Sequence, residues 1–192
     1  MLSNPVIENI FARRSIRSYS NEPVNDTIIK DLIKAGFQAA NGMNLQKLRF
    51  MVVTNTEKLQ EYSKIGKAEY LKLMAEWGIS NPGLEANLKN EAYSIFYDAP
   101  AAIFIFGAPG ILTGVEDASL AAGNIMLAAR SLGIGTCWIG LAAGLGNNKT
   151  FLKECKIPND HKLLATIILG YPKSEFPEPS KRSDPQVLAW VR

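Results

Sequence analysis

A short apolar run near the middle of the chain constrains the fold more than any other feature. The residues from Ala101 to Phe106 (Ala-Ala-Ile-Phe-Ile-Phe) include no polar side chain. A strand that faces water on one side alternates apolar and polar residues, whereas a strand covered on both sides is apolar throughout. We therefore expect a strand here that is buried on both faces, at the centre of the fold.

Helical and strand-like patterns alternate irregularly along the rest of the chain. Further strands are expected at Leu48–Thr54, Gly135–Ile139 and Leu163–Leu169. Helices are expected at Pro5–Ala12 after Asn4, from the cap residue Asn25 to about Ala40, at Glu116–Leu132, and over a short stretch from Thr56. This order predicts an α+β fold, a three-layer sandwich of helices around a small central mixed sheet.

The length of 192 residues suits a single domain that spans residues 1–192. Within it, residues 68–97 have an interrupted helical pattern and are interpreted as a lid or an insertion. After Tyr171 the chain is rich in proline, which predicts an extended tail without a helix. The prolines of this tail are Pro172, Pro177, Pro179 and Pro185.

Composition excludes several classes of function. The net charge of +3 is too small to indicate a nucleic-acid-binding protein, and no apolar run reaches membrane-spanning length. The N-terminal residues do not resemble a signal peptide, and two cysteines, Cys137 and Cys155, do not make a disulfide framework. We therefore expect a cytoplasmic protein. The single histidine, His161, excludes a histidine-rich metal site.

Positive charge is concentrated in two places that are far apart in the sequence. The first is Arg13-Arg14-Ser15-Ile16-Arg17, directly after the first expected helix, and the second is Lys181-Arg182 in the proline-rich tail. Arginine presents a fork of donors that suits phosphate, and serine adds a neutral donor. The alternative explanation of the first cluster is a basic helix end that complements the helix dipole.

The chain lacks the motifs of enzymes that use side-chain nucleophiles, since it has no serine elbow and no P-loop. Cys137 lies within an apolar strand, where a buried and inert thiol is expected. A chain without these motifs can still be an enzyme if a bound cofactor supplies the reactivity. Asn44 and Gln46 could contact the rim of a planar heterocycle or could cap their own turn. The glycines that flank residues 134–139 could admit a flat ring or make a tight helix-to-strand connection.

Several segments together resemble the nitroreductase family of FMN-dependent oxidoreductases. The resemblance begins at Arg13–Arg17 and continues through the loop that ends at Gln46. It then includes Asp98-Ala99-Pro100, the stretch from Ala121 to Ala129, residues 135–140, Leu169-Gly170-Tyr171-Pro172 and Lys181-Arg182. These segments occur in the family's order over nearly the whole chain.

The resemblance implies a nitroreductase-like fold that forms a homodimer with FMN at the subunit interface. It assigns Arg13, Ser15 and Arg182 to the phosphate or ribityl chain, with Arg14 and Lys181 in support. It places Arg17 at the N1/O2 edge of the flavin, where a cation stabilises the reduced anion, as the catalytic residue. Asn44 and Gln46 would come from the partner subunit, and the backbone of Ile139 and Gly140 would lie beside N5.

The implied function is transfer of hydride from NADH or NADPH, through flavin N5, to a small-molecule electron acceptor by a ping-pong mechanism. The acceptor would be a nitroaromatic, a quinone or an enone. The sequence departs from the family pattern at Lys47-Leu48, where the family often has proline and tryptophan, and at Leu141, where it often has a second glycine. Lys47 is expected to add positive charge near the flavin or the substrate.

Two other functions remain open on the sequence alone. The first is a flavin-binding, flavin-storage or flavin-consuming protein of the same fold, which would share every cofactor-binding residue. The second is a basic module without flavin that binds phosphorylated ligands or nucleic acid.

Overall fold

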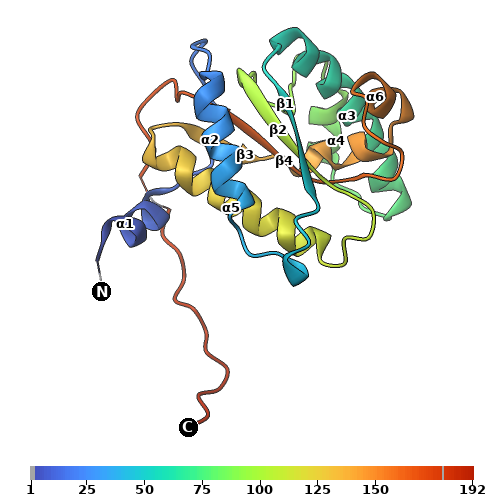
Figure 1. Cartoon of the computed structure of the whole chain (residues 1–192). Helices are drawn as coiled ribbons and strands as arrows, with labels where there is room; N and C mark the ends of the chain where they lie inside the picture. Colours follow the sequence, from blue (N-terminus) through green and yellow to red (C-terminus); the bar gives the residue numbers. More distant parts are fainter. Residues whose placement is uncertain (1–2, 179) are drawn as a thin grey trace.

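The computed structural model describes residues 3–178 and 180–192, and its centre is a four-stranded sheet in the order β1-β2-β4-β3 (Figure 1). The strands are β1 (Leu48–Val53), β2 (Ala101–Gly107), β3 (Gly135–Trp138) and β4 (Lys162–Gly170). Neighbouring strands pair antiparallel throughout. The parallel component of the expected mixed sheet is an isolated bridge between Ser15 and Thr136, outside the named strands.

Strand β2 is buried along its whole length, as the apolar run predicts. Successive side chains of a strand point to opposite faces, and the two faces of β2 contribute to separate apolar clusters. Ile103 and Ile105 pack into one cluster, whereas Phe104 and Phe106 pack into the other. The sheet is therefore covered on both sides, which confirms the three-layer arrangement.

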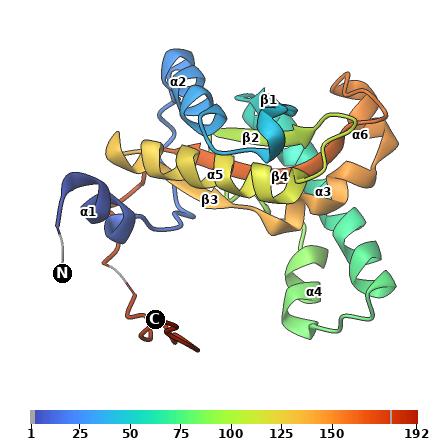
Figure 2. The same ribbon diagram turned by 60° about the horizontal axis from the view of Figure 1, so that its bottom comes forward.

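Helices from different parts of the chain cover the two faces of the sheet (Figures 1 and 2). One face packs against α2 (Asp26–Phe37) and α5 (Gly114–Ser131). The other packs against α3 (Thr56–Glu76), α4 (Pro82–Lys89), the 3-10 helix η2 (Gly140–Asn147) and α6 (Lys149–Glu154). Helix α1 (Pro5–Ala12) lies at the end of the sandwich next to α5.

The helix starts follow from their capping residues. The side chain of Asn4 accepts hydrogen bonds from the N–H groups of Val6 and Ile7, both at 3.0 Å, and Pro5 occupies the first position of α1. Asn25 caps α2 in the same way. Helix α2 ends at Phe37, before the expected Ala40, and the loop that follows contains the 3-10 helix η1 (Gly42–Asn44).

The prediction of a short helix from Thr56 is wrong, because α3 continues for 21 residues to Glu76. The sequence between Ala68 and Glu76 therefore completes α3, and the break at Asn81 precedes α4. Figure 2 shows α4 and the end of α3 projecting from the body. In contrast, Ile95 and Phe96 are fully buried in the core. The role of residues 68–97 as a lid stays a prediction.

The chain after β4 forms an extended tail that leads away from the body (Figure 1). No helix or strand occurs in the described residues 173–178 and 180–192, as expected from their prolines. Pro179 and the first two residues lie outside the described part of the chain. The tail ends in exposed apolar side chains, namely Val187, Leu188, Trp190 and Val191. Within the described residues, no helix has both the length and the hydrophobicity that a membrane crossing requires.

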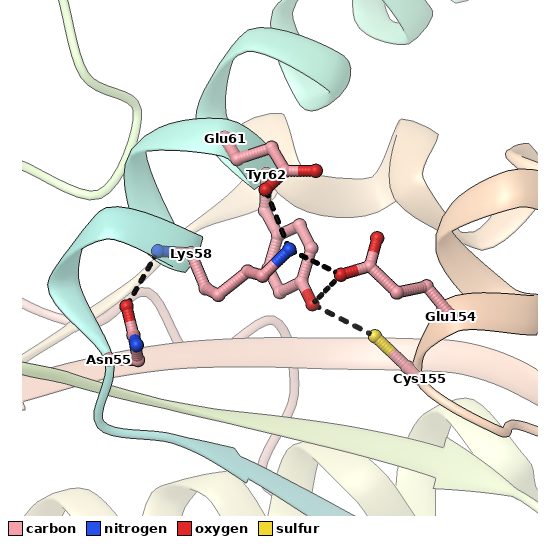
Figure 3. A network of polar contacts seen from close by, with 6 residues as sticks. All are labelled: Asn55, Lys58, Glu61, Tyr62, Glu154 and Cys155. Atoms are coloured by element: carbon pink, nitrogen blue, oxygen red, sulfur yellow. Dashed lines mark hydrogen bonds and ion pairs between the residues drawn. The ribbon is translucent and has the colours of Figure 1, made fainter.

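A polar network joins the start of α3 to the end of α6 (Figure 3). The ammonium of Lys58 lies 2.6 Å from a carboxylate oxygen of Glu154 and 2.8 Å from one of Glu61. The hydroxyl of Tyr62 lies 3.4 Å from Glu154 and 3.4 Å from the Cys155 sulfur. The hydrogen bond from Lys58 lowers the pKa of Glu154 below its usual value. The network therefore ties α6 to α3 through ionised groups at neutral pH.

We expect Glu154→Gln to lower the Tm slightly at pH 7 and by less near pH 3. A carboxylate with a lowered pKa stabilises the fold above its unfolded pKa, and this contribution is lost as the pH falls through the folded pKa. The difference in Tm between the variant and the unmodified protein should therefore shrink as the pH falls below the usual range of a glutamate pKa. The measurement is thermal unfolding at both pH values, with the exposed Glu22→Gln as control. A Tm difference that is equal at the two pH values would contradict the role of this ion pair.

Candidate active site

Helix α1 ends at Ala12, so the arginine cluster lies beyond the helix. Arg13 is the C-terminal cap, with extended backbone angles (φ −62°, ψ 133°), and its N–H donates to the carbonyl of Asn9 at 3.0 Å. The last turn of α1 contains no basic residue. Only Arg13 lies at the helix end, so the helix dipole does not explain the rest of the cluster.

The segment that carries the cluster runs along the edge of β3. Ser15 forms the parallel bridge with Thr136, and the N–H of Ile16 donates to the carbonyl of Thr136 at 2.9 Å. A Cβ atom on Gly135 would lie 2.7 Å from Cγ1 of Ile16, which is too close for any residue but glycine. The glycine at the start of β3 thus lets the N-terminal segment lie directly against the strand.

The same segment then pairs with the chain that leaves β4. Tyr19 forms an antiparallel bridge with Pro172, and the N–H of Ser20 donates to the carbonyl of Tyr171 at 2.8 Å. The N–H of Lys173 donates to the carbonyl of Ser18 at 3.1 Å. These bonds start the tail alongside the N-terminal segment.

Arg130, at the end of α5, holds both segments with one side chain. Its Nε donates to the carbonyl of Ala12 at 3.3 Å, and its guanidinium carbon lies 4.1 Å from the centre of the Phe176 ring. The first contact fixes the end of α1, and the second fixes the tail just before Pro177. Sequence reasoning did not single out Arg130, because its pattern is that of an ordinary basic residue in a last helical turn.

As a result, the two basic segments face one cavity of about 450 Å³. Its lining residues are Arg13, Arg14, Ser15, Arg17, Pro177, Glu178, Ser180, Lys181 and Arg182. Every residue that the sequence analysis assigned to the phosphate and ribityl chain is therefore present in one place. Arg17 lines the same cavity.

The cavity is strongly cationic, with Glu178 as the only carboxylate among its lining residues. None of the arginine or lysine side chains that line the cavity forms an ion pair with a described residue. The Nε atom of Arg14 is buried and has no hydrogen-bond partner, although the same side chain donates to the carbonyl of Arg13. Several positively charged side chains in one place, with hydrogen-bond donors that have no partner, suit an anion that carries several acceptor oxygens, such as a phosphate.

Cys137 lies in β3 and is buried, as expected. Burial raises the pKa of its thiol, and the positive charge of Arg17 opposes this shift only in part. The thiolate is the reactive form of cysteine, so a thiol with a raised pKa is a poor nucleophile at neutral pH. The structure therefore supports the interpretation of Cys137 as an inert core residue.

Asn44 and Gln46 do not line the cavity. They lie in the exposed loop between α2 and β1, where the side chain of Gln46 donates to that of Asn44 at 3.2 Å. Met43, Asn44 and Gln46 all have left-handed backbone angles, with φ values of 50°, 53° and 53°. Such angles cost energy in residues other than glycine, and they persist only where the surroundings hold them.

A buried carboxylate anchors this loop. Oδ1 of Asp117, on α5, accepts hydrogen bonds from the N–H of Gly42 at 3.0 Å and from the hydroxyl of Thr113 at 2.9 Å. The side chain of Asn41 accepts one from the N–H of Gln46 at 3.0 Å. These bonds hold the loop that presents Asn44 and Gln46 in one conformation. The sequence suggested Asn44 and Gln46 as caps of this turn, but the side chain that accepts from its backbone is that of Asn41.

The structure also separates Ile139 and Gly140 from the basic cavity. They line a small space of about 40 Å³ at the other end of β3. The N–H of Ile139 already donates to the carbonyl of Thr166 at 2.8 Å, whereas no atom would lie within 4 Å of a Cβ on Gly140. The tight helix-to-strand connection occurs at Gly133, whose φ of 73° favours glycine.

Lys47, which departs from the family pattern, lies next to the Asn44–Gln46 loop. Its ammonium donates to the carbonyl of Pro109 at 2.7 Å. Within its own chain, Lys47 thus holds the loop that precedes α5. Its expected contribution of charge near a flavin or substrate stays a prediction.

Comparisons with known proteins point consistently to one family. The model of the nitroreductase family matches residues 10–171. A protein of Archaeoglobus fulgidus, provisionally assigned as an NADH dehydrogenase/NAD(P)H nitroreductase, is 30% identical over 189 residues, which cover 93% of each chain. The crystal structure of a nitroreductase with bound FMN from Bacteroides fragilis NCTC 9343 has a TM-score of 0.84 at 27% identity, over 98% of this chain and 100% of the other. A nitroreductase with bound FMN from Desulfitobacterium hafniense DCB-2 has a TM-score of 0.81 at 25% identity, over 100% of both chains.

We expect Asp117→Ala to destabilise the fold by about 1–3 kcal/mol, because it leaves the N–H of Gly42 without its acceptor. Thr113→Val removes only the hydroxyl partner and is expected to cost about 1 kcal/mol. Urea unfolding measures both changes, and hydrogen exchange at the amide of Gly42 reports on the loop itself. Unchanged exchange at Gly42 in the Asp117 variant would show that the loop does not depend on this carboxylate.

Proposed function

The chain belongs to the nitroreductase family, and on that premise we propose that it is an FMN-dependent enzyme that oxidises NADH or NADPH and reduces a small organic acceptor. The proposed acceptors are nitroaromatics, quinones or enones, which bind after the oxidised nicotinamide has left. The observation that carries the proposal is the convergence of Arg13–Arg17 and Lys181-Arg182 on one cavity.

The chemistry of the donor set fits the phosphate of FMN. We propose that Arg13, Ser15 and Arg182 bind the phosphate or the ribityl chain and that Arg14 and Lys181 support them. A phosphate monoester has a charge of about −1.5 to −2 at neutral pH and several acceptor oxygens. The unpaired cations of the cavity and the unused Nε of Arg14 match both properties.

Bound FMN would supply the hydride chemistry, by accepting a hydride from the nicotinamide and passing it to the acceptor. The proposed part of Arg17 is to hold positive charge at the N1/O2 edge, where negative charge develops on reduction. A fixed cation at that place is more effective in a site that excludes water than in bulk solvent. Arg17 belongs to the same cavity as the proposed phosphate ligands, which supports this assignment.

The backbone of residues 139–140 is proposed to lie beside flavin N5. Because the N–H of Ile139 is bonded to Thr166, the amide of Gly140 is the one left to act as donor. The open space around Gly140 is compatible with the approach of a flat ring. Asn44 and Gln46 would then have to come from a second subunit, since they do not line the basic cavity of their own chain.

We therefore propose a homodimer with the cofactor at the interface. Large apolar side chains are exposed on α1, α5 and the tail, and water is a poor environment for such a set. They include Val6, Phe11, Val115, Leu120, Leu188 and Trp190. A second copy of the chain would cover these groups and would bring its rigid Asn44–Gln46 loop to the site.

The purified protein is expected to be yellow, with the absorption spectrum of oxidised flavin. Anaerobic addition of NADPH or NADH should bleach it, and a quinone should restore the colour over many cycles. A yellow protein that the nicotinamides fail to reduce would favour the flavin-storage or flavin-consuming alternative. A colourless protein with salt-dependent affinity for nucleic acid would overturn the proposal.

Two arginine variants separate cofactor binding from reduction. Arg182→Ala removes a charged donor to the phosphate and is expected to weaken FMN binding about 10- to 100-fold. Arg17→Ala is expected to leave FMN affinity within about threefold but to slow flavin reduction about tenfold or more. Fluorescence titration gives the Kd of FMN, and anaerobic stopped-flow absorbance gives the reduction rate.

Lys153→Ala is the matched control, because it removes one positive charge from α6, outside the cavity. It should change neither quantity. Equal losses of binding and reduction rate in both arginine variants would count against the separate roles.

A further inference from the structure

Arg17 has one defined partner on its guanidinium, and that partner is an aromatic ring. In the described chain Arg17 forms no ion pair. Its guanidinium carbon lies 5.8 Å from the centre of the Tyr97 ring. A guanidinium within about 6 Å of a ring face is attracted by the negative charge of the π system. The contact restricts an otherwise exposed and flexible side chain.

The Tyr97 ring is itself fixed by Tyr93. Their ring centres lie 6.0 Å apart with planes at 90°, an edge-to-face pair, and their hydroxyl oxygens are 3.3 Å apart. Burial, together with the hydrogen bond to Tyr97, raises the pKa of Tyr93 to about 12. The hydroxyl of Tyr93 therefore stays protonated at neutral pH, and the bond between the two tyrosines persists. Edge-to-face pairs of this kind have a preferred geometry, so Tyr93 limits how the Tyr97 ring can turn.

The backbone under the pair is also held in place. Ile95 and Phe96, between the two tyrosines, are completely buried, and the N–H of Ile95 donates to the hydroxyl oxygen of Ser63 at 3.0 Å. Tyr97 and Asp98 have left-handed angles, with φ values of 51° and 53°. Residues other than glycine adopt such angles at an energetic cost, which the buried anchor must offset. The core thus dictates where the Tyr97 ring lies.

We propose that Tyr97 is a positioning residue for Arg17. Through this contact, the segment before β2 contributes to the stabilisation of the reduced flavin by Arg17. The Tyr97 ring holds the guanidinium at one place in the cavity, and Tyr93 holds the ring. The inference rests on the proposed function, because it assigns Arg17 to the flavin edge. It gives the end of the 68–97 segment a task distinct from that of a lid.

The first test uses the protein without FMN. Tyr97→Leu removes the ring, whereas Tyr97→Phe keeps it and removes only the hydroxyl. In the unmodified protein, ring currents should shift the side-chain Nε–H and CH₂ proton resonances of Arg17 upfield. This shift should vanish in Tyr97→Leu and remain in Tyr97→Phe. If Tyr97→Leu leaves the Arg17 resonances unchanged, the contact does not exist in solution and the proposal is wrong.

The second test compares the affinities for oxidised and reduced FMN through the midpoint potential. We expect Tyr97→Leu to lower the preference for the reduced form about two- to fivefold, the size of a partly exposed cation–π contact. For a two-electron couple this corresponds to a shift of roughly 10–20 mV to more negative potential. Tyr97→Phe should keep a midpoint potential close to that of the unmodified protein. Tyr93→Phe should give a potential between those of the unmodified protein and Tyr97→Leu.

Tyr70→Leu is the matched control, since Tyr70 packs edge-to-face on Trp77 and does not line the cavity. It should lose stability without a change in potential. A Tyr97→Leu protein that binds FMN with an unchanged potential, while Arg17→Ala shifts it, would overturn this inference and leave the proposed function intact. Failure of the unmodified protein to bind FMN would instead overturn the proposed function.

Discussion

The pairing of residues 15–20 with the edge of β3 and with the chain that leaves β4 is the interaction on which the site depends. Backbone hydrogen bonds at Thr136, Tyr171 and Lys173 set the N-terminal segment and the start of the tail side by side. Backbone bonds of this kind fix register and direction, so they deliver the side chains of both segments to one place. Arg130 contacts both segments, and the cations come together although none of them forms an ion pair with a described residue.

Much of the fold could be predicted from local patterns, because each of these depends on near neighbours in the sequence. The continuous apolar run predicted that β2 is buried on both faces, and Asn4 and Asn25 predicted the starts of α1 and α2. The convergence of the two basic clusters was also predicted, but from the family resemblance. No local sequence pattern predicts that Arg13 and Arg182 line the same cavity.

Other features were out of reach because they arise only from tertiary contacts. The second half of α3 packs on the core through Leu73 and Met74, but the sequence was divided at Ala68, so the continuation of this helix to Glu76 was missed. Asp117 has the pattern of an acidic residue in a first helical turn, yet it is buried because the loop at Gly42 folds back on it. Tyr97 lies at the end of the segment interpreted as a lid or an insertion, and only the structure shows the Arg17 guanidinium against its ring.

The cavity has two walls of unequal strength. The wall that carries residues 13–17 is built on a strand edge, whereas the wall that carries residues 177–178 and 180–182 belongs to an exposed tail without regular secondary structure. Exposed segments of this kind are preferred sites of proteolytic cleavage. A single cut after the exposed Lys173 would leave all four strands of the sheet in the remaining chain and would remove Lys181 and Arg182 together. The cleaved protein would keep its sheet and helices but only the N-terminal half of the cationic cavity. Measurements of folding alone would not distinguish it from the uncleaved protein.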